Sequence, residues 1–435
     1  MNKFFKSVLI ALAAIYIFLI GGIFGFKQIE PMVSLRLGFD FFFTTDEHGK
    51  TPRQKIENAL GLYPHDEVFA SDYQPSSSED YAPVHVEGLS DRRAQPLVFI
   101  DPQKRQPGLT VINAALDRDA GLHGVLLLDE RGQVLHIWPV DERYADTPSG
   151  RIVPHAVHVF RDGSIIVVND FGADLARIDA CGDPIWSRQM GTHHSISEND
   201  DGSFWTWDGD FAVRVDGETG EILQEFNLGE VIEANPEIDI YAVLQTDRLD
   251  GSAWMGDPLH ANDIEALPAA MASAFPMFEP GDVVISMRSL NLLSVIDPDT
   301  KKVKWWRFGV GRRQHDPDWR PDGTILIFDN NTNRGYSRIR SISPSDYQIT
   351  DVVTGESYDF LTARRGRQDV RDSGAIVVVS SYQGRVFELD ENGEIVFEFV
   401  NSYDPDSGLV ARVGDGFVLP LDYFDEMPSC DIAPG

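Results

Sequence analysis

Short apolar runs separated by turn-forming residues recur along the chain from about residue 106 onward. One form of the repeat starts at a histidine, reaches an Asp-Gly pair seven residues later and continues into a β-rich run. Asp-Gly between two strand-like runs is typical of a β-hairpin, because both residues tolerate the backbone angles of a tight turn. Phrases of this form start at His155, His194 and His315, and a weaker copy has Gln368 in place of the histidine.

A hairpin of a second type, with an Asp-containing turn between two strands, follows each phrase. Two hairpins make a unit of four strands, and about six units fit between residues 106 and 400. Four-stranded units at this spacing predict an all-β fold, a six-bladed β-propeller, with a β-helix or a sandwich as the alternative. The second hairpins occupy residues 124–138, 175–189, 212–226, 292–308 and 385–399.

Two segments depart from the simple repeat. The unit that starts at His260 carries an insertion near residues 269–278, ahead of Gly281, which could cover the mouth of the central channel. The tail, residues 401–435, is strand-like. It is expected to help close the ring, because closure removes exposed sheet edges.

An uncharged apolar run covers residues 7–26, which is the length that the core of a bilayer requires. Lys3 and Lys6 precede it, so the positive-inside bias predicts a transmembrane signal anchor over residues 1–26. The N-terminus would stay in the cytoplasm, and the bulk would lie in the periplasm or extracellular space. A cleaved signal peptide is the alternative. Residues 27–105 are expected to form a stalk or linker that packs on the propeller.

The chain is strongly acidic, with a formal net charge of −32 spread along its length. A negative field repels phosphate backbones, so a nucleic-acid partner is disfavoured. The sequence contains neither a P-loop nor a zinc signature, and no cofactor is expected. The two cysteines, Cys181 and Cys430, are too few for a disulfide framework. They either form one bridge between the tail and the body or remain two unrelated thiols.

The repeated histidines are the main candidates for chemistry. The first strand of every propeller blade lines the central channel, so His155, His194, His260 and His315 should converge there. Imidazole is a nucleophile, a proton carrier and an anion partner near neutral pH. A hydrogen-bonding role within each blade is the alternative, and His155 is the weakest of the four candidates.

Neighbouring residues indicate what such a site would bind. Asn262 lies two residues after His260 and shares its face if the segment is extended. Arg288 ends a strand, and the paired donors of its guanidinium suit a tetrahedral oxyanion. The site should therefore attract a sulfate or phosphate group, although several histidines could instead bind a metal ion. Aromatic residues at 204–207 either line a slot or pack within their strand.

Four phrases resemble, in this order along the chain, those of the bacterial arylsulfate sulfotransferase family. They cover residues 193–202 (His-His, then Asp-Gly), 259–264 (LHANDI), 285–288 (ISMR) and 314–330 (QHD, then PDGTILIFDN). The resemblance implies a six-bladed propeller that transfers a sulfuryl group from a phenolic sulfate ester to another phenol, without a nucleotide donor. Its small-molecule partners would be an aryl sulfate and a phenol.

The resemblance also implies roles for individual residues. His315 matches the histidine that becomes transiently sulfated in the family. His260, Asn262 and Arg288 match positions that bind the sulfuryl oxygens or assist proton transfer.

His194 matches a further catalytic histidine, and the family phrases also include His193 and Asn330 as expected substrate-binding residues. Better-known members carry an N-terminal β-rich domain for pairing subunits, which residues 27–105 do not resemble, so dimerisation stays open. A second hypothesis is a membrane-tethered propeller that binds a protein partner or a sulfated ligand without chemistry. A third is a metal-dependent hydrolase.

Overall fold

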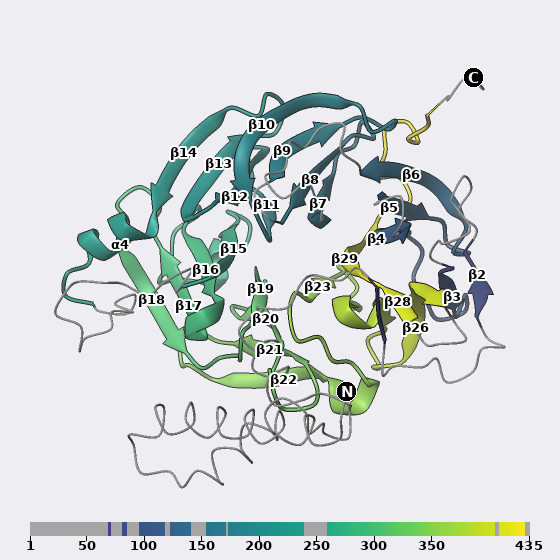
Figure 1. Cartoon of the computed structure of the whole chain (residues 1–435). Helices are drawn as coiled ribbons and strands as arrows, with labels where there is room; N and C mark the ends of the chain where they lie inside the picture. The colour runs from purple at the N-terminus through teal and green to yellow at the C-terminus, as the bar shows by residue number, and fades with distance from the viewer. Residues whose placement is uncertain are drawn as a thin grey trace, which may run out of the picture. The chain divides into compact units, whose positions relative to one another are not determined.

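Six antiparallel sheets lie in a ring around a central axis in the computed structural model of the chain (Figure 1). Each innermost strand contacts the innermost strand of the next sheet, and the sixth contacts the first, so the ring is closed. The predicted six-bladed β-propeller is therefore confirmed. The structure describes residues 68–70, 81–84, 95–117, 122–140, 154–170, 173–238, 259–404 and 409–430.

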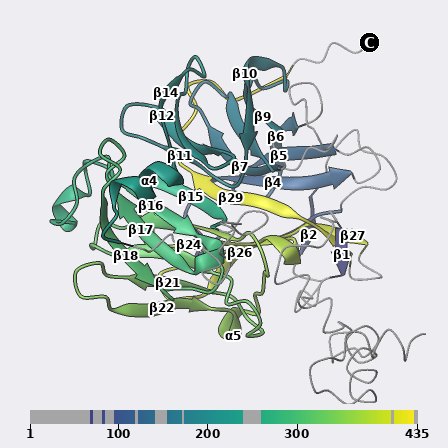
Figure 2. The same ribbon diagram turned by 60° about the vertical axis from the view of Figure 1, so that its left-hand side comes forward.

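The first three blades contain four strands each and follow one another around the ring (Figure 2). From the axis outward, they are blade 1 with β29 (Val413–Leu419), β4 (Leu109–Asp117), β5 (Leu122–Leu128) and β6 (Val134–Val140); blade 2 with β7 (Pro154–Val159), β8 (Ile165–Asn169), β9 (Ala173–Ile178) and β10 (Pro184–Thr192); and blade 3 with β11 (Ile196–Glu198), β12 (Ser203–Asp208), β13 (Phe211–Asp216) and β14 (Ile222–Asn227).

The last blade is larger than the others, because two strands that precede blade 1 in the sequence extend its outer edge. From the axis outward, the remaining blades are blade 4 with β15 (Ala261–Ala266), β16 (Val283–Met287), β17 (Leu292–Ile296) and β18 (Val303–Phe308); blade 5 with β19 (His315–Trp319), β20 (Ile325–Asp329), β21 (Arg338–Ile342) and β22 (Ile349–Thr354); and blade 6 with β23 (Arg367–Val370), β24 (Ile376–Ser380), β25 (Arg385–Leu389), β26 (Ile395–Val400), β3 (Leu97–Ile100) and β2 (Ala82–Pro83).

The residue pattern of each strand follows its place in the blade. Every residue of β8, β16, β17 and β20 is buried, because both faces of a middle strand pack against neighbouring blades. The outer strand β10 instead has mostly exposed residues. The Asp-Gly turns lie between the first and second strands. Their aspartates, at positions 162, 201 and 322, accept hydrogen bonds of 2.9–3.1 Å from the N–H two residues later.

The C-terminal segment closes the ring. Strand β29 pairs with β4 and forms the inner edge of blade 1, so the propeller continues past the boundary predicted at residue 400. A disulfide joins Cys181 to Cys430, which resolves the open question about these cysteines in favour of one bridge. The C-terminal segment is thereby joined to blade 1 through β29 and to blade 2 through the disulfide.

Short elements complete the described structure: β1 (Val68–Ala70), β27 (Ser402–Asp404) and β28 (Leu409–Ala411), which form a small sheet; the helices α4 (Leu228–Ala234) and α5 (Gly355–Tyr358); and the 3-10 turns η2 (Ala272–Ala274), η3 (Arg288–Leu290) and η4 (Ser381–Gln383). The predicted anchor, residues 1–26, lies outside the described residues. Within the part that is described, no helix combines the length and apolar character that crossing a bilayer requires.

Candidate active site

Four histidines from four blades meet at one end of the inner strands. The ring of His194 lies at the centre, with centroid distances of 4.8 Å to His155, 5.0 Å to His260 and 6.1 Å to His315. We call these four residues the histidine cluster. The predicted convergence is confirmed, and it includes His155, which was the weakest of the four candidates in the sequence.

The backbone is irregular at the places from which these histidines project. Pairing of the first and second strands shifts register beside His155 in blade 2, beside Asn262 in blade 4 and after His315 in blade 5. His194 and His260 themselves have positive φ angles of 63° and 47°. Bulges re-aim side chains, and left-handed non-glycine residues concentrate at functional sites. The cluster is thus held by backbone that regular strands would not provide.

Hydrogen bonds fix which nitrogen of His315 carries a proton. The Asn330 amide nitrogen donates to the backbone carbonyls of Thr362 (2.9 Å) and Arg365 (2.6 Å), so its side-chain oxygen must face His315. That oxygen accepts a hydrogen bond from His315 Nδ1 at 2.6 Å. The neutral ring therefore has its lone pair on Nε2. The bonds of Asn330 orient His315, and the predicted contact of Asn330 with substrate stays a prediction.

The same reasoning assigns the tautomers of the adjacent pair His193 and His194. The backbone carbonyl of Gly209 accepts a hydrogen bond from His193 Nε2 at 2.8 Å. The Nδ1 atom of His193 is then an acceptor, and it receives a hydrogen bond from His194 Nδ1 at 2.9 Å. His194 consequently has its lone pair on Nε2. These bonds make His193 a support for His194, and its predicted contact with substrate stays a prediction.

His155 has a charged support. Its Nδ1 donates to Asp170 at 2.9 Å, and the second carboxylate oxygen of Asp170 accepts from Arg365. All three side chains are buried. The sequence analysis missed Asp170 and Arg365. Asp170 could have been found, because it follows His155 by fifteen residues, and Asn330 follows His315 by the same interval.

Arg288 and Asn262 belong to the same region. The backbone N–H of Arg288 donates to the carbonyl of His260 at 3.0 Å, and its buried positive charge acts on His315. The amide nitrogen of Asn262 donates to the carbonyl of Gln314 at 2.8 Å, next to His315. The predicted neighbours of the histidines are therefore present beside them.

Burial lowers the pKa values of His155, His194 and His315. It lowers the pKa of His155 to about 3, with Arg365 as a further cause. It also lowers the pKa values of His194 and His315 well below the ordinary range, and Arg288 lowers that of His315 further. Desolvation disfavours the charged imidazolium. These rings are consequently neutral at neutral pH, which leaves their Nε2 lone pairs available.

Carboxyl groups gather farther along the same inner strands. We call Asp263 and Glu265 of β15 and Asp316 and Asp318 of β19 the carboxyl cluster. Arg367 of β23 forms an ion pair with Asp316 at 2.8 Å. Burial raises the pKa of Asp263 to about 8, and the neighbouring Asp316 adds to this shift. Burial raises the pKa of Asp316 to about 6, although Arg367 opposes it.

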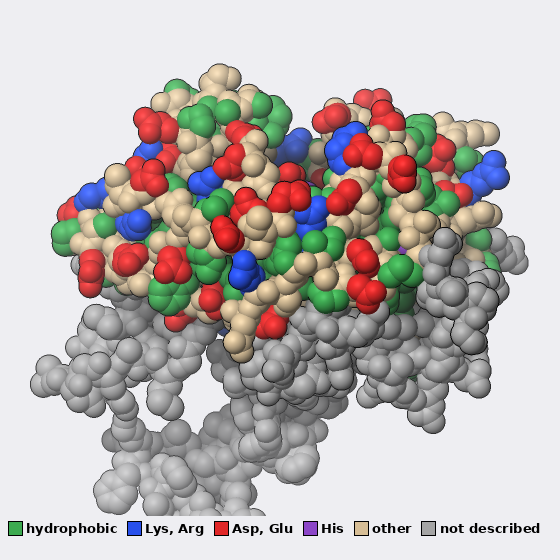
Figure 3. All heavy atoms as spheres, turned by 90° about the horizontal axis from the view of Figure 1, so that it is seen from above, with side chains coloured by type: hydrophobic (Ala, Val, Ile, Leu, Met, Phe, Trp, Pro, Cys, Tyr) green, Lys and Arg blue, Asp and Glu red, His purple; other side chains and the backbone are tan. Residues whose placement is uncertain are grey.

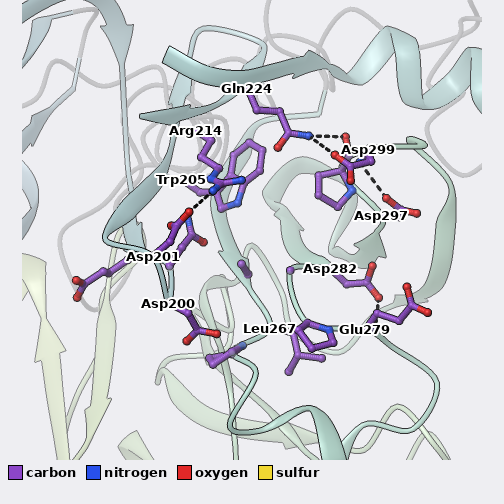
Figure 4. A pocket seen from close by; sticks show the side chains of 17 residues that line it. Asp200, Asp201, Trp205, Arg214, Gln224, Leu267, Glu279, Asp282, Asp297 and Asp299 are labelled. Carbon is purple, nitrogen blue, oxygen red and sulfur yellow. Dashed lines mark hydrogen bonds and ion pairs between the residues drawn. The ribbon is translucent and has the colours of Figure 1, made fainter. Parts of the chain in front are cut away.

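An acidic surface pocket of about 430 Å³ lies elsewhere, between blades 3 and 4 (Figure 4). Its lining includes Asp200, Asp201, Glu279 and Asp299 and none of the histidines. Figure 3 shows acidic side chains spread over one face of the propeller. An aryl sulfate is an anion, so neither surface favours its binding.

Two further expectations are answered by the structure. The insertion near residues 269–278 follows β15, so it lies at the opposite end of that strand from His260, about 20 Å away by strand length. The insertion is therefore not at the end of the channel where the histidines meet, and the expectation that it covers a mouth of the channel stays a prediction. Its Phe275 and Phe278 pack on Trp319, at 4.8 and 5.6 Å between ring centroids. The aromatic residues at 204–207 are buried strand packing, and Trp207 stacks on His193.

Comparison with known families gives a match over most of the propeller. The model of the arylsulfotransferase family (ASST) matches residues 157–402, which is more than half of the chain. The chain belongs to the arylsulfotransferase family. At the level of the family, it is a transferase that acts on aryl sulfates and phenols. The resemblance seen in the sequence is confirmed.

Two solved structures are distantly similar to the chain. A protein of unknown function from Bacteroides caccae is 11% identical, with 72% of this chain and 99% of that chain covered and a TM-score of 0.49. A catalytically inactive virginiamycin B lyase from Staphylococcus aureus, in complex with quinupristin, is 11% identical over 73% of this chain and 84% of that chain, with a TM-score of 0.38. Neither similarity bears on function. No curated protein matches the chain.

Proposed function

We propose that the histidine cluster transfers a sulfuryl group from a phenolic sulfate ester to a phenolic acceptor, through a sulfo-histidine at His315 and without a nucleotide donor. The observation that carries this proposal is the bond between His315 Nδ1 and Asn330. It supports a lone pair on Nε2 of a ring whose pKa burial depresses, so the ring is a nucleophile at neutral pH.

The reaction consists of two displacements at sulfur. In the first, His315 Nε2 forms an N–S bond while the bond from sulfur to the aryl oxygen breaks, and the phenolate that leaves takes up a proton. In the second, the acceptor phenol gives up a proton and its oxygen attacks sulfur, which releases His315. The enzyme lends one proton and recovers it, and ping-pong kinetics follow.

Arg288, His260 and Asn262 are the groups that would stabilise the sulfuryl oxygens. A guanidinium offers paired donors to a tetrahedral oxyanion, and it is held beside the nucleophile before substrate arrives. One amide proton of Asn262 is committed to the carbonyl of Gln314, so its second proton remains for the sulfuryl group.

His194 is the proposed acid and base. Its Nδ1 proton is donated to His193, so Nε2 is the atom that would exchange a proton with the leaving phenolate and the acceptor phenol. The ring lies 6.1 Å from that of His315, measured between centroids, which leaves room for the ester oxygen between them. A positioned acid or base of this kind contributes about 10²- to 10⁴-fold in rate.

We also propose that residues 1–26 anchor the chain in a membrane, with the N-terminus in the cytoplasm and the propeller in the periplasm or extracellular space. The disulfide between Cys181 and Cys430 supports this placement, because disulfides persist in oxidising compartments. Protease added to intact cells or spheroplasts should cleave the propeller. Protection that ends only on lysis would contradict the placement.

The test of the transfer reaction uses the purified full-length chain, 4-nitrophenyl sulfate and a phenolic acceptor. Rapid quenching followed by peptide mass spectrometry should find the sulfo group on His315, and His315→Ala should abolish transfer. His158→Gln is the matched control, because His158 lies on β7 in contact with Phe204, outside the cluster. Transfer that survives His315→Ala would refute the nucleophile. A folded protein that transfers from no aryl sulfate would favour a binding module instead.

A further inference from the structure

Blades 2 and 5 hold a histidine by the same kind of hydrogen bond, but the acceptor differs between them. In each, Nδ1 of the histidine donates to a side chain fifteen residues later, at the end of the second strand. For His315 the acceptor is the neutral amide of Asn330. For His155 it is the carboxylate of Asp170.

The difference changes what each ring can hold. An amide oxygen fixes the tautomer and is uncharged, so it raises the pKa of His315 less than burial and Arg288 lower it, and the ring keeps its lone pair. A carboxylate fixes the same tautomer and also stabilises the imidazolium. Asp170 is ionised, because Arg365 and the imidazoles hold its pKa well below the ordinary value despite its burial. The acceptor Asn330 therefore suits a nucleophilic histidine, and the acceptor Asp170 suits a histidine that holds a proton.

We propose that Asp170, held between His155 and Arg365, is a positioning residue that lets the pair His155 and His194 retain the proton that the leaving phenolate requires. This inference rests on the proposed function. His194 is close enough to be served, since its ring centroid lies 4.8 Å from that of His155. Its backbone N–H also points to the same oxygen of Asp170, at 3.5 Å.

In the absence of the donor, His155 and His194 carry no extra proton, because burial lowers the pKa of His155 to about 3 and lowers that of His194 well below its ordinary value. An aryl sulfate brings a negative charge to this region, and an opposite charge favours the imidazolium. Binding of the donor is therefore accompanied by uptake of one proton. The first displacement passes that proton to the phenolate, and the second returns it from the acceptor phenol, so charge and atoms balance over the cycle.

His155, Asp170 and His194 could also be considered as metal ligands, because one candidate atom from each lies within 4.8 Å of the others. Both oxygens of Asp170 are already engaged, one by His155 and one by the guanidinium of Arg365. A cation at this point would displace the first bond and face a positive charge. The arrangement accordingly fits a proton better than a metal ion.

Proton uptake is measured by titrating the purified full-length protein with benzylsulfonate, in which a CH2 group replaces the ester oxygen. Calorimetry in buffers with different ionisation enthalpies should give about one proton taken up per sulfonate bound, as the exchange of one proton requires. Asp170→Asn should reduce this uptake at least threefold, and His158→Gln should not change it. His315→Ala should keep it, so a failed nucleophile and a failed proton store give different results.

Kinetics supply the second readout. Asp170→Asn should lower kcat/KM about 10²- to 10⁴-fold with phenyl sulfate, whose leaving phenolate needs protonation, and less than about 10-fold with 4-nitrophenyl sulfate, whose phenolate is a stable anion. An equal loss with both donors, or unchanged proton uptake, would overturn the proposal. So would a stoichiometric metal ion in the purified protein together with loss of activity on chelation.

Discussion

The inner strands of blades 4 and 5 carry opposite chemistries at neighbouring positions. His260 and His315 stand where these strands begin, and Asp263 and Asp316 follow within three residues. Burial acts on His315 and on the two carboxyl groups in opposite senses. It lowers the pKa of the imidazole and raises the pKa values of the carboxyl groups, because in each case the charged form is the one that loses solvation. One physical cause therefore produces a neutral imidazole and, beside it, carboxyl groups that bind protons more tightly than exposed ones.

The largest loss of activity is expected on substitution of Arg288. If its buried charge stabilises the sulfuryl oxygens, Arg288→Ala should lower kcat/KM about 10³-fold, as the loss of one preorganised donor does in other enzymes. Arg288→Lys should recover only part of this loss, because a point charge does not replace paired donors. Steady-state kinetics with 4-nitrophenyl sulfate measures both. Full activity in Arg288→Ala would remove this residue from the site.

A smaller effect is expected from changing Asn330, the hydrogen-bond acceptor of His315. Asn330→Asp places a carboxylate against Nδ1, which should raise the pKa of His315 and protonate the ring at low pH. Sulfuryl transfer by the variant should then fall about 10-fold for each pH unit below the new pKa, whereas transfer by the wild type should change little over the same range. A pH profile of kcat/KM tests this. Identical profiles for variant and wild type would show that the bond to Asn330 does not govern the nucleophile.

The carboxyl cluster is tested by measuring stability. The pKa of Asp263 is raised to about 8 in the folded state, so its contribution to stability is complete below the unfolded pKa of about 4 and is lost as pH rises toward 8. Asp263→Asn removes that loss. We expect the variant to melt about 2–4 °C higher than the wild type at pH 8, with no gain at pH 4.5. A gain of the same size at both pH values would contradict the assignment.

Asp415 is the matched control at this end. It accepts from the backbone N–H of Val157 at 3.0 Å and pairs with Arg367 at 3.3 Å, so it is engaged as a charge. Asp415→Asn should therefore destabilise the propeller by about 1–3 kcal/mol at pH 7, the cost of leaving the half-buried guanidinium of Arg367 less well paired. Chemical denaturation measures the change. A stabilised variant would place Asp415 with the neutral carboxyl groups.

The smallest effect on activity is expected at the rim. The double variant Cys181→Ser with Cys430→Ser should lose about 2–4 kcal/mol of stability, because the bridge closes a long loop. Its kcat/KM should stay within about twofold of the wild type, since neither cysteine belongs to the histidine cluster. Thermal unfolding and the aryl sulfate assay check the two parts. A large kinetic loss would show that the geometry of the cluster depends on the rim.

The fold could be predicted from sequence because repetition encodes it. The spacing from His155, His194 and His315 to the Asp-Gly turns places one side chain per blade at the same radius, and circular closure does the rest. What surrounds that position was harder to predict. Asp170 meets His155 only because the second strand returns beside the first, so its role depends on strand register, which a one-residue bulge can change.

Other misses have the same origin. The insertion after β15 lies at the end of that strand away from His260, which could not be predicted because sequence order does not state in which direction a strand runs relative to the axis. Asp263 and Asp318 read as ordinary acidic residues in a chain with a net charge of −32, and only burial distinguishes them from solvated ones. Predictions that depended on the repeat were correct, as were the positions of Asn262 and Arg288 close to the repeated histidines, whereas partners brought in by strand pairing, such as Asp170, were not predicted.

The position of β29 constrains how the protein can be made. The strand that completes the first blade follows blade 6 in the sequence, so blade 1 lacks its inner edge until residue 419 has emerged from the ribosome. Blades 2 to 6 precede this strand in the sequence, yet the ring stays open beside His155 until β29 is inserted. A nascent chain, or one truncated before this strand, would therefore lack the closed ring that brings the histidine cluster together.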